Sequence, residues 1–469
     1  MRKYLIALVA VLALPAAAQN VDIEALSGLQ FNFGNPGARS LGMGGAFLGL
    51  ADDASAAEAN PAGLTILRKP EVSIEVRNYL EQQLFTTTGT FPEMVRTPFT
   101  YHSDRAVITF ASAVFPIKNF TLGAYFHEPL NNQGGGIVDI TEDPITGDVL
   151  GRPNFFMPTE VVGDEIQYVG TPISEQECEN RREQMNNPFA CLEFRLDPFV
   201  SVLQLRQRTF GLAGGWQVHP KFSVGGSVRH QRFQEVAGTL RLDPNTGQLK
   251  QLLYQSTADI ENGNLEIKEE TDITFSVGFK WAPTDKISVG GVYKKGPEFA
   301  APLLYADASN DFELQVAADV KFHVPDVAGI GVSVRPIPTL TINFDAVHVK
   351  YSNLVDDFVA ASAEVSGIDE PFKANDVVEL RLGAEYLFST RIPFAIRGGY
   401  WRDPAHSVQW NGPLNHPTFV AEQILYPEGE DQNHFSIGAG LAWPRFQIDV
   451  AYDTSDQYKV GSISAVTRF

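Results

Sequence analysis

The chain has 469 residues, among them 40 glycines, with 11% aromatic and only 20% charged residues. Its formal net charge is −20, which argues against nucleic acid as a partner because phosphate binding needs a basic surface. The length suggests two or three soluble domains. No linker-like stretch divides the sequence, however, and the composition is typical of an all-β chain.

Residues 1–18 have the pattern of a secretory signal peptide. Two cations, Arg2 and Lys3, precede an apolar run from Tyr4 to Leu14, and small residues supply a cleavage site after Ala18. The run is too short to span a bilayer, and no later segment is long and apolar enough. We therefore expect an exported chain without a helical membrane span.

Residues 34–64, GNPGARSLGMGGAFLGLADDASAAEANPAGL, are rich in glycine and alanine and show no strand-like alternation. A segment of this composition buries too little apolar surface to fold alone. We expect the rest of the chain to enclose it.

A hairpin with a proline in or beside its turn recurs along the rest of the chain. The strand pairs are 106–115 with 120–128, 203–217 with 222–233, 273–281 with 287–295, 327–335 with 340–351, 376–388 with 394–401, and 435–443 with 446–453. Proline suits such turns because it presets φ and needs no ladder donor. With residues 71–79 in front and 459–469 behind, the total is fourteen strands.

The strands alternate, and their connections differ in length. Val378, Leu380 and Leu382 face one way, while Glu379 and Arg381 face the other. The proline turns are short, whereas the links 80–105, 129–202, 234–272, 296–326, 352–375 and 402–434 are long and mostly polar. This asymmetry and an even strand number are typical of outer-membrane barrels. The sequence thus predicts an all-β fold, a 14-stranded antiparallel transmembrane β-barrel over residues 71–469.

Signals of an enzyme are poor. Gly42-Met43-Gly44-Gly45 follows no predicted strand and lacks the third glycine of a phosphate-binding loop. No serine lies in a G-x-S-x-G elbow, and the nine histidines are scattered. We expect no catalytic residues, no metal and no cofactor.

Alternation places a set of charged side chains inside the predicted barrel. Arg381 and Arg397, on adjacent strands, are our candidates for cations that meet the anionic head of a ligand. Their neighbours Glu379 and Glu385 support the alternative, in which the charges pair with one another as structural contacts.

The long link 129–202 holds the only two cysteines, Cys178 and Cys191. In an exported protein they can form a disulfide that closes a loop; the alternative is two free thiols. The same link carries Phe155 and Phe156, which could form an apolar landing groove for a ligand.

Three motifs carry a resemblance to a known family. They are GARSLGMGGAF at residues 37–47, ADDASA at 51–56 and NPAGL at 60–64, and together they resemble the FadL/TodX family of outer-membrane transporters of hydrophobic compounds. The resemblance implies an N-terminal, partly helical hatch at residues 19–70 inside the barrel, with Asn60, Pro61 and Ala62 as its gate. It also implies ligand capture at outer loops, a pocket near the hatch and lateral exit at a kink in the third strand. Gly123 is the candidate position of this kink.

The leading hypothesis is passive uptake of long-chain fatty acids or other hydrophobic small molecules across the outer membrane. The protein would be a monomer surrounded by outer-membrane lipid and lipopolysaccharide. A competing hypothesis is a barrel that serves as an assembly, shuttle or interaction component, because similar motifs occur in such barrels. A barrel enzyme is the weakest alternative.

Overall fold

The protein is described here by a computed structural model. It covers residues 33–88, 95–102, 106–138, 154–156, 160–162, 165–167, 172–185, 192–194, 199–242, 248–261, 264–308, 311–318, 320–356, 371–412, 429–456 and 458–469. The predicted signal peptide, residues 1–18, lies outside the described residues.

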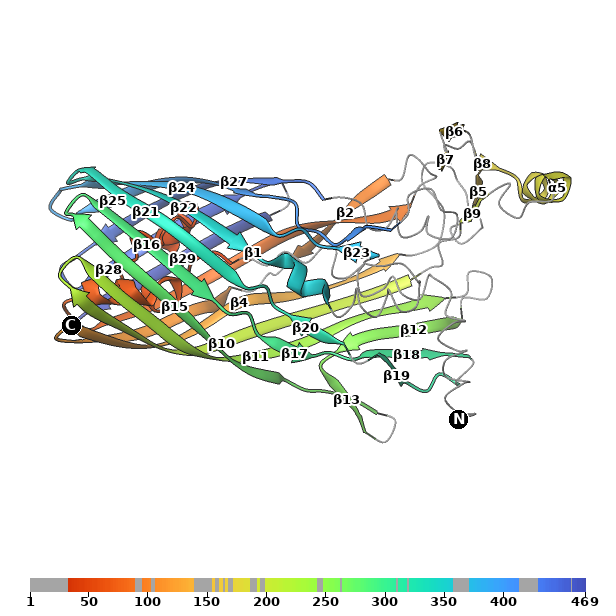
Figure 1. The fold of residues 1–469 in the computed structure, drawn as a ribbon, viewed down its shortest axis with the longest axis horizontal. Coiled ribbons are helices and arrows are strands. Elements are labelled where there is room, and N and C mark those ends of the chain that lie inside the picture. Colours follow the sequence, from red (N-terminus) through yellow and green to blue (C-terminus); the bar gives the residue numbers. More distant parts are fainter. Residues whose placement is uncertain are drawn as a thin grey trace.

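Fourteen antiparallel strands close into a barrel, as predicted (Figure 1). In wall order they are β1 (Glu71–Thr88), β3 (Val107–Ile117), β4 (Phe120–Val138), β10 (Phe199–His219), β11 (Phe222–Leu242), β15 (Glu270–Thr284), β16 (Ile287–Lys294), β21 (Val327–Ile337), β22 (Leu340–Val349), β24 (Val377–Phe388), β25 (Phe394–Asp403), β27 (Gln432–Ala442), β28 (Phe446–Thr454) and β29 (Tyr458–Arg468). β1 pairs with both β3 and β29, which closes the sheet.

The two ends of the barrel differ. At one end, called here the turn end, short turns join the strands. At the other, the loop end, long links contain further strands, so the expectation that these links are loops is only partly right. β2 (Val95–His102), β12 (Leu249–Ser256), β18 (Leu303–Asp307) and β19 (Gln315–Ala318) extend the barrel sheet.

The long links also form small sheets and helices of their own. The small sheets pair β5 (Asn154–Phe156) with β8 (Pro172–Ile173) and β9 (Leu192–Phe194), β6 (Glu160–Val162) with β7 (Glu165–Gln167), β13 (Ala258–Glu261) with β14 (Asn264–Ile267), β17 (Glu298–Ala300) with β20 (Lys321–His323), and β23 (Phe372–Lys373) with β26 (Gln409–Trp410). The helices are α5 (Glu175–Met185) and η4 (Tyr351–Val355). None of the helices in the described part of the chain is long and apolar enough to cross a membrane.

Residues 33–70 lie in the lumen near the turn end, where Figure 1 shows their short helices inside the wall. We call this segment the hatch. Its helices are α3 (Ala38–Leu41), α4 (Ala56–Ala59) and η2 (Pro61–Ile66). The expectation that the wall encloses residues 34–64 is met, since nearly every residue of this stretch is buried.

The hatch packs directly against the backbone of the wall. Wall glycines lie where it approaches: a Cβ added at Gly290 would overlap the backbone oxygen of Leu48, and one at Gly383 would overlap the oxygen of Met43. A wall carboxylate also contacts hatch backbone, because Asp345 accepts hydrogen bonds from the amides of Phe47 at 2.7 Å and Leu48 at 2.8 Å. The small inward residues of the strands therefore form the seat of the hatch.

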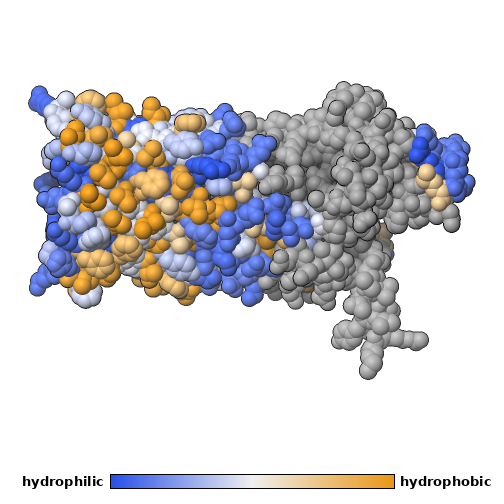
Figure 2. All heavy atoms as spheres, turned by 45° about the horizontal axis from the view of Figure 1, so that its top comes forward, coloured by the Kyte–Doolittle hydropathy of each residue, from blue (hydrophilic) through white to orange (hydrophobic). Residues whose placement is uncertain are grey.

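The outward side chains form an apolar band around the barrel. Figure 2 shows this band between two hydrophilic zones. Exposed members are Val72, Leu122, Leu212, Val228, Ile273, Ile330, Phe344, Leu382, Ile396, Ile437 and Ile463. The inward positions between them are small or polar, such as Ser227 and Ser276. The strands therefore alternate as predicted, but their apolar side chains face outward and their polar side chains face inward, the opposite of a soluble protein.

Candidate functional site

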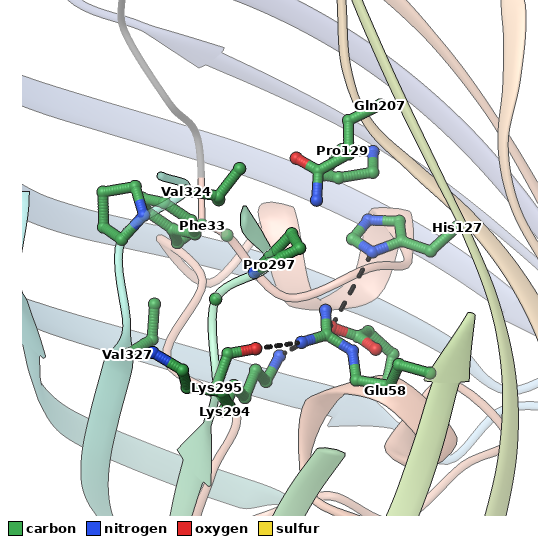
Figure 3. Close-up of a pocket in the computed structure, with 14 residues that line it drawn as sticks. Phe33, Glu58, His127, Pro129, Gln207, Lys294, Lys295, Pro297, Val324 and Val327 are labelled. Carbon is green, nitrogen blue, oxygen red and sulfur yellow. Dashed lines mark hydrogen bonds and ion pairs between the residues drawn. The ribbon is translucent and has the colours of Figure 1, made fainter. Parts of the chain in front are cut away.

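A pocket lies in the lumen directly above the hatch, on its loop-end side (Figure 3). The residues that line it are Phe33, Gly34, Glu58, His127, Pro129, Gln207, Arg229, Lys294, Lys295, Gly296, Pro297, Val324, Pro325 and Val327. They come from the hatch, from β4, β10, β11 and β21, and from the segments around β16 and β20. The cavity is about 40 Å³, more than the roughly 10–15 Å³ that one water molecule needs on the same measure. It therefore has room for a small polar group.

One hatch carboxylate joins two wall cations and a histidine in this pocket. Oε1 of Glu58 accepts hydrogen bonds from Arg229 Nη2 at 3.1 Å and Lys294 Nζ at 3.0 Å, and His127 Nδ1 lies 3.9 Å away. Glu58, Arg229 and His127 are all buried. Figure 3 shows His127 and Lys294 on either side of Glu58. A buried carboxylate requires such partners because desolvation strongly disfavours an isolated charge.

The other side of the pocket is apolar. Phe33, Val324 and Val327 line it and also belong to, or pack against, a large buried hydrophobic cluster of the loop-end half. Within this cluster Phe299 and Phe322 stack on Phe233, each with ring centroids 4.8 Å apart. The pocket thus joins a cationic floor to an apolar region.

Asp326 fixes the segment that forms the rim of the pocket. Its carboxylate accepts hydrogen bonds from Tyr293 Oη at 2.7 Å and from the Gly296 amide at 2.8 Å, and Lys295 Nζ lies at 3.2 Å. Burial raises the pKa of Asp326, but these donors outweigh it and hold the pKa below its ordinary value. Asp326 is therefore an ionised tether of the rim.

Asn60, Pro61 and Ala62 lie where the hatch contacts β10, β11 and β15. The side-chain amide nitrogen of Asn60, Nδ2, donates to the backbone oxygens of Leu48 at 3.3 Å and Phe279 at 3.1 Å. The side-chain oxygen Oδ1 caps η2 by accepting a hydrogen bond from the backbone amide of Ala62. Ser223 Oγ donates to the Ala62 oxygen at 2.9 Å. The gating role predicted for these residues stays a prediction. Their contacts make them anchors of the hatch.

The cationic cluster and these anchors are close in the chain. Glu58 lies in α4, whose last turn leads directly into Asn60, and the Asn60 amide N–H donates to the Ala56 oxygen at 3.0 Å. A movement of the Glu58 carboxylate would therefore be passed through α4 to Asn60, which holds the hatch to the wall.

The third barrel strand, β4, has an irregularity at a position other than the one expected. Gly123 pairs regularly with Val114 and Ala213, so the register has no irregularity there, and the kink expected at this position stays a prediction. The register shifts instead at Glu128 and Pro129, which together face one residue of β10. This bulge is consistent with the missing N–H of proline. The β3–β4 ladder also ends near this level, at His127.

Arg381 and Arg397 lie beside the hatch, on β24 and β25, and neither lines the pocket described above. Arg381 forms an ion pair with Glu379 and lies over the ring of Trp401, 4.9 Å from its centroid. Arg397 contacts Glu385 at 2.7 Å and Asp449 at 2.8 Å. The ligand contact predicted for these two arginines stays a prediction, while their described partners are carboxylates of the wall.

Glu385 extends this ionic network into the hatch. Arg39 of α3 contacts Glu385 at 2.9 Å and also lies 3.6 Å from Asp53. The network therefore connects the hatch to the wall at a second place, away from the pocket.

The predicted disulfide is supported at one of its two cysteines, because Cys178 is disulfide-bonded. Cys178 is buried in α5, and Cys191 lies outside the described residues, as does part of the loop around Phe155 and Phe156. The identity of the partner as Cys191 and the landing groove both stay predictions.

The residues of the cationic pocket were missed from the sequence, although signals for them exist. Arg229 follows the lumen-facing Ser227 by two residues on β11, and Lys294 follows the lumen-facing Val292 by two residues on β16. Strand alternation therefore turns both cations toward the lumen. Glu58 is the only charged residue between Asp53 and Arg68. A lone acid in such a segment, with inward cations on several strands, indicates a buried cluster.

A closed barrel with a hatch in its lumen and a pocket above the hatch defines a class, the plugged β-barrel channels. A family model described as outer membrane protein transport protein (OMPP1/FadL/TodX) matches residues 199–464. The chain belongs to this family, and the resemblance found in its sequence motifs is confirmed. Members of the family are transport proteins.

Solved structures share the fold. The toluene transporter TbuX of Ralstonia pickettii is 16% identical with a TM-score of 0.56, over 94% of this chain and 100% of that one. A FadL homologue of Pseudomonas aeruginosa is 15% identical with a TM-score of 0.55, over 94% and 100%. The monoaromatic hydrocarbon channel CymD is 17% identical with a TM-score of 0.54, over 94% and 99%. None of the curated protein sequences compared with the chain matches it.

Proposed function

We propose that this protein is a monomeric channel of the outer membrane for the passive uptake of hydrophobic small molecules, and that its ligands include long-chain fatty acids. Family membership and the apolar outward band support the location and the general role. Uptake needs no energy source, because each buried CH₂ group of the ligand gains about 0.8 kcal/mol on leaving water.

The observation that carries the fatty-acid assignment is the joining of cations and apolar side chains in one pocket. Arg229 and Lys294 supply positive charge, and Val324 and Val327 lead into the buried hydrophobic cluster. A fatty acid complements both parts, because its carboxylate can contact the cations while its acyl chain contacts the apolar side chains. A neutral aromatic ligand would use only the apolar part.

In this proposal Glu58 occupies the place of the ligand's carboxylate. An entering carboxylate competes with Glu58 for Arg229 and Lys294, which are held at 3.1 Å and 3.0 Å. Displacement of Glu58 releases α4 and loosens the adjoining Asn60-Pro61-Ala62 anchor. The charge of the ligand thus loosens the hatch next to the pocket.

The bulge of β4 supports a lateral exit. Glu128 and Pro129 interrupt the regular register between β4 and β10, next to His127 and Pro129 of the pocket. A ligand that leaves the pocket through the wall at this level enters the membrane and avoids the tightly seated hatch below.

The test compares oleate with oleyl alcohol, which has the same chain and no charge. Binding of both to purified protein in detergent is measured by titration, and uptake of both is measured in cells that lack their own transporter. Substitution of Arg229→Gln together with Lys294→Gln is expected to weaken oleate binding about tenfold, the value of one lost charge-assisted hydrogen bond. Binding of oleyl alcohol is expected to stay the same.

Equal loss for both ligands would overturn the head-group assignment, because the substitution would then act on the fold. Failure of the unaltered protein to bind or take up either ligand would overturn transport itself and favour an assembly or interaction role for the barrel.

A further inference from the structure

Three arginines lie on the outward face of two neighbouring strands. Arg206 and Arg208 lie on β10 and Arg232 lies on β11, at positions that alternate with the buried lumen residues Gln207 and Gln231. The arginine side chains are 37%, 21% and 44% exposed, respectively. The outward face of a barrel is otherwise the place for apolar side chains.

The positive charges of this group exceed their carboxylate partners. Arg208 and Arg232 are direct cross-strand neighbours, an arrangement that destabilises a sheet unless a counter-charge is present. Glu269 pairs with Arg208 and lies 3.5 Å from Arg232, and Glu128 lies 3.0 Å from Arg206. Within the described part of the chain, three guanidinium groups thus share these two carboxylates, and the chain as a whole has a net charge of −20.

The arginines lie at the loop-end border of the apolar band. The next outward positions toward the turn end are Phe210 on β10 and its cross-strand neighbour His230 on β11, and the exposed pair Leu212 and Val228 follows. Arg232 lies over the ring of Phe210, 5.6 Å from its centroid. Because the loop end of such barrels faces outward from the cell, this border is at the level of the head groups of the outer leaflet.

We propose that Arg206, Arg208 and Arg232 form a binding site for lipopolysaccharide, at the phosphate groups of its lipid A part. The inference rests on the outer-membrane location proposed above but not on the identity of the transported ligand. A guanidinium binds phosphate through two parallel charge-assisted hydrogen bonds. Glu269 is one carboxylate for two guanidinium groups, and one phosphate between Arg208 and Arg232 would supply a second counter-charge, while the acyl chains lie against Phe210, Leu212 and Val228.

Lipopolysaccharide fits this site better than a phospholipid. Lipid A occupies the outer leaflet, where the arginines lie, and it carries two phosphates that can engage Arg206 as well as the Arg208 and Arg232 pair. A phospholipid offers one phosphate.

The experiment measures binding of lipid A to the whole purified protein by native mass spectrometry. The double variant Arg208→Gln, Arg232→Gln is expected to bind bisphosphorylated lipid A about tenfold more weakly than the unaltered protein. The matched control is Arg402→Gln on β25, an outward arginine whose partner is Asp431 and whose side chain is 53% exposed. It is expected to bind like the unaltered protein.

A second arm needs no variant and so does not depend on its folding. The unaltered protein is offered lipid A from which both phosphates have been removed, and binding is expected to fall by a similar factor. Phosphatidylglycerol at equal concentration is expected not to displace lipid A. Equal binding by the unaltered protein and the double variant, indifference to the phosphates, or displacement by phosphatidylglycerol would each overturn the proposal. Oleate binding by the double variant is expected to be unchanged, so failure of the transport proposal would be seen separately.

Discussion

The side-chain amide of Asn60 donates a hydrogen bond of 3.1 Å to the backbone oxygen of Phe279, a wall residue 219 positions away in the chain. The same amide reaches the Leu48 oxygen. One side chain thus holds two parts of the hatch and one wall strand together.

Replacement of Asn60 by alanine is expected to destabilise the seated hatch. The buried oxygens of Leu48 and Phe279 lose a donor, and such a loss costs about 1–3 kcal/mol. Urea unfolding in lipid vesicles, followed by tryptophan fluorescence, measures the free energy of unfolding. The control is Asn78→Ala at an exposed position of β1, and an equal effect of both substitutions would contradict the anchoring role.

Substitution of Gly290→Ala is expected to displace the hatch without changing any charge. The new methyl group would overlap the Leu48 oxygen and approach the Asn60 amide; such overpacking costs about 1–3 kcal/mol. We expect the ion conductance of the protein in planar bilayers to rise. The matched control is Gly398→Ala, where an added Cβ meets nothing within 4 Å, and its conductance should equal that of the unaltered protein.

Replacement of Glu58 by glutamine is expected to strengthen oleate binding. The neutral amide competes less well for Arg229 and Lys294, so the affinity for oleate should rise about tenfold, while the affinity for oleyl alcohol stays constant. Titration of both ligands measures this. Glu177→Gln on α5, where the side chain is 51% exposed, serves as the control. Weaker oleate binding by the Glu58 variant would contradict competition between the two carboxylates.

The contribution of Asp326 to stability is expected to depend on pH. Its folded-state pKa is lower than the ordinary value, which is about 3.9. The ionised form therefore stabilises the fold above that pH, and this contribution is lost as the pH falls through the lower, folded-state value. Thermal unfolding of the unaltered protein and of Asp326→Asn should differ at pH 6 and converge under acid. A difference that stays constant would argue against the tether.

The barrel wall could be predicted from the sequence because each strand carries its own signal. In β24 the alternation of Leu380 with Arg381 states which face meets the lumen, and the proline turns mark where strands reverse. The strands of the long links lack this pattern. β12, for example, pairs with both β11 and β18, and its sequence, LKQLLYQS, has no strict alternation.

The site was less predictable because its residues meet only in three dimensions. Glu58 lies 171 positions from Arg229 and 236 from Lys294, and nothing local to any of them indicates the other two. The register irregularity at Glu128 and Pro129 follows from how two strands pair, so inspection of one strand pointed to Gly123 instead. Motifs could locate the hatch, whereas the pocket depends on the closed barrel.

The glycine seat of the hatch bears on what the cell must keep out. At Gly290 and Gly383 the wall and the hatch are in backbone contact, which leaves no continuous aqueous path at those points. Polar solutes dissolved in water therefore cannot pass between hatch and wall at those two points, whereas in the proposed uptake an apolar compound moves from one apolar surface to another. The proposed uptake of apolar compounds is thus compatible with a membrane that excludes water-soluble toxic compounds.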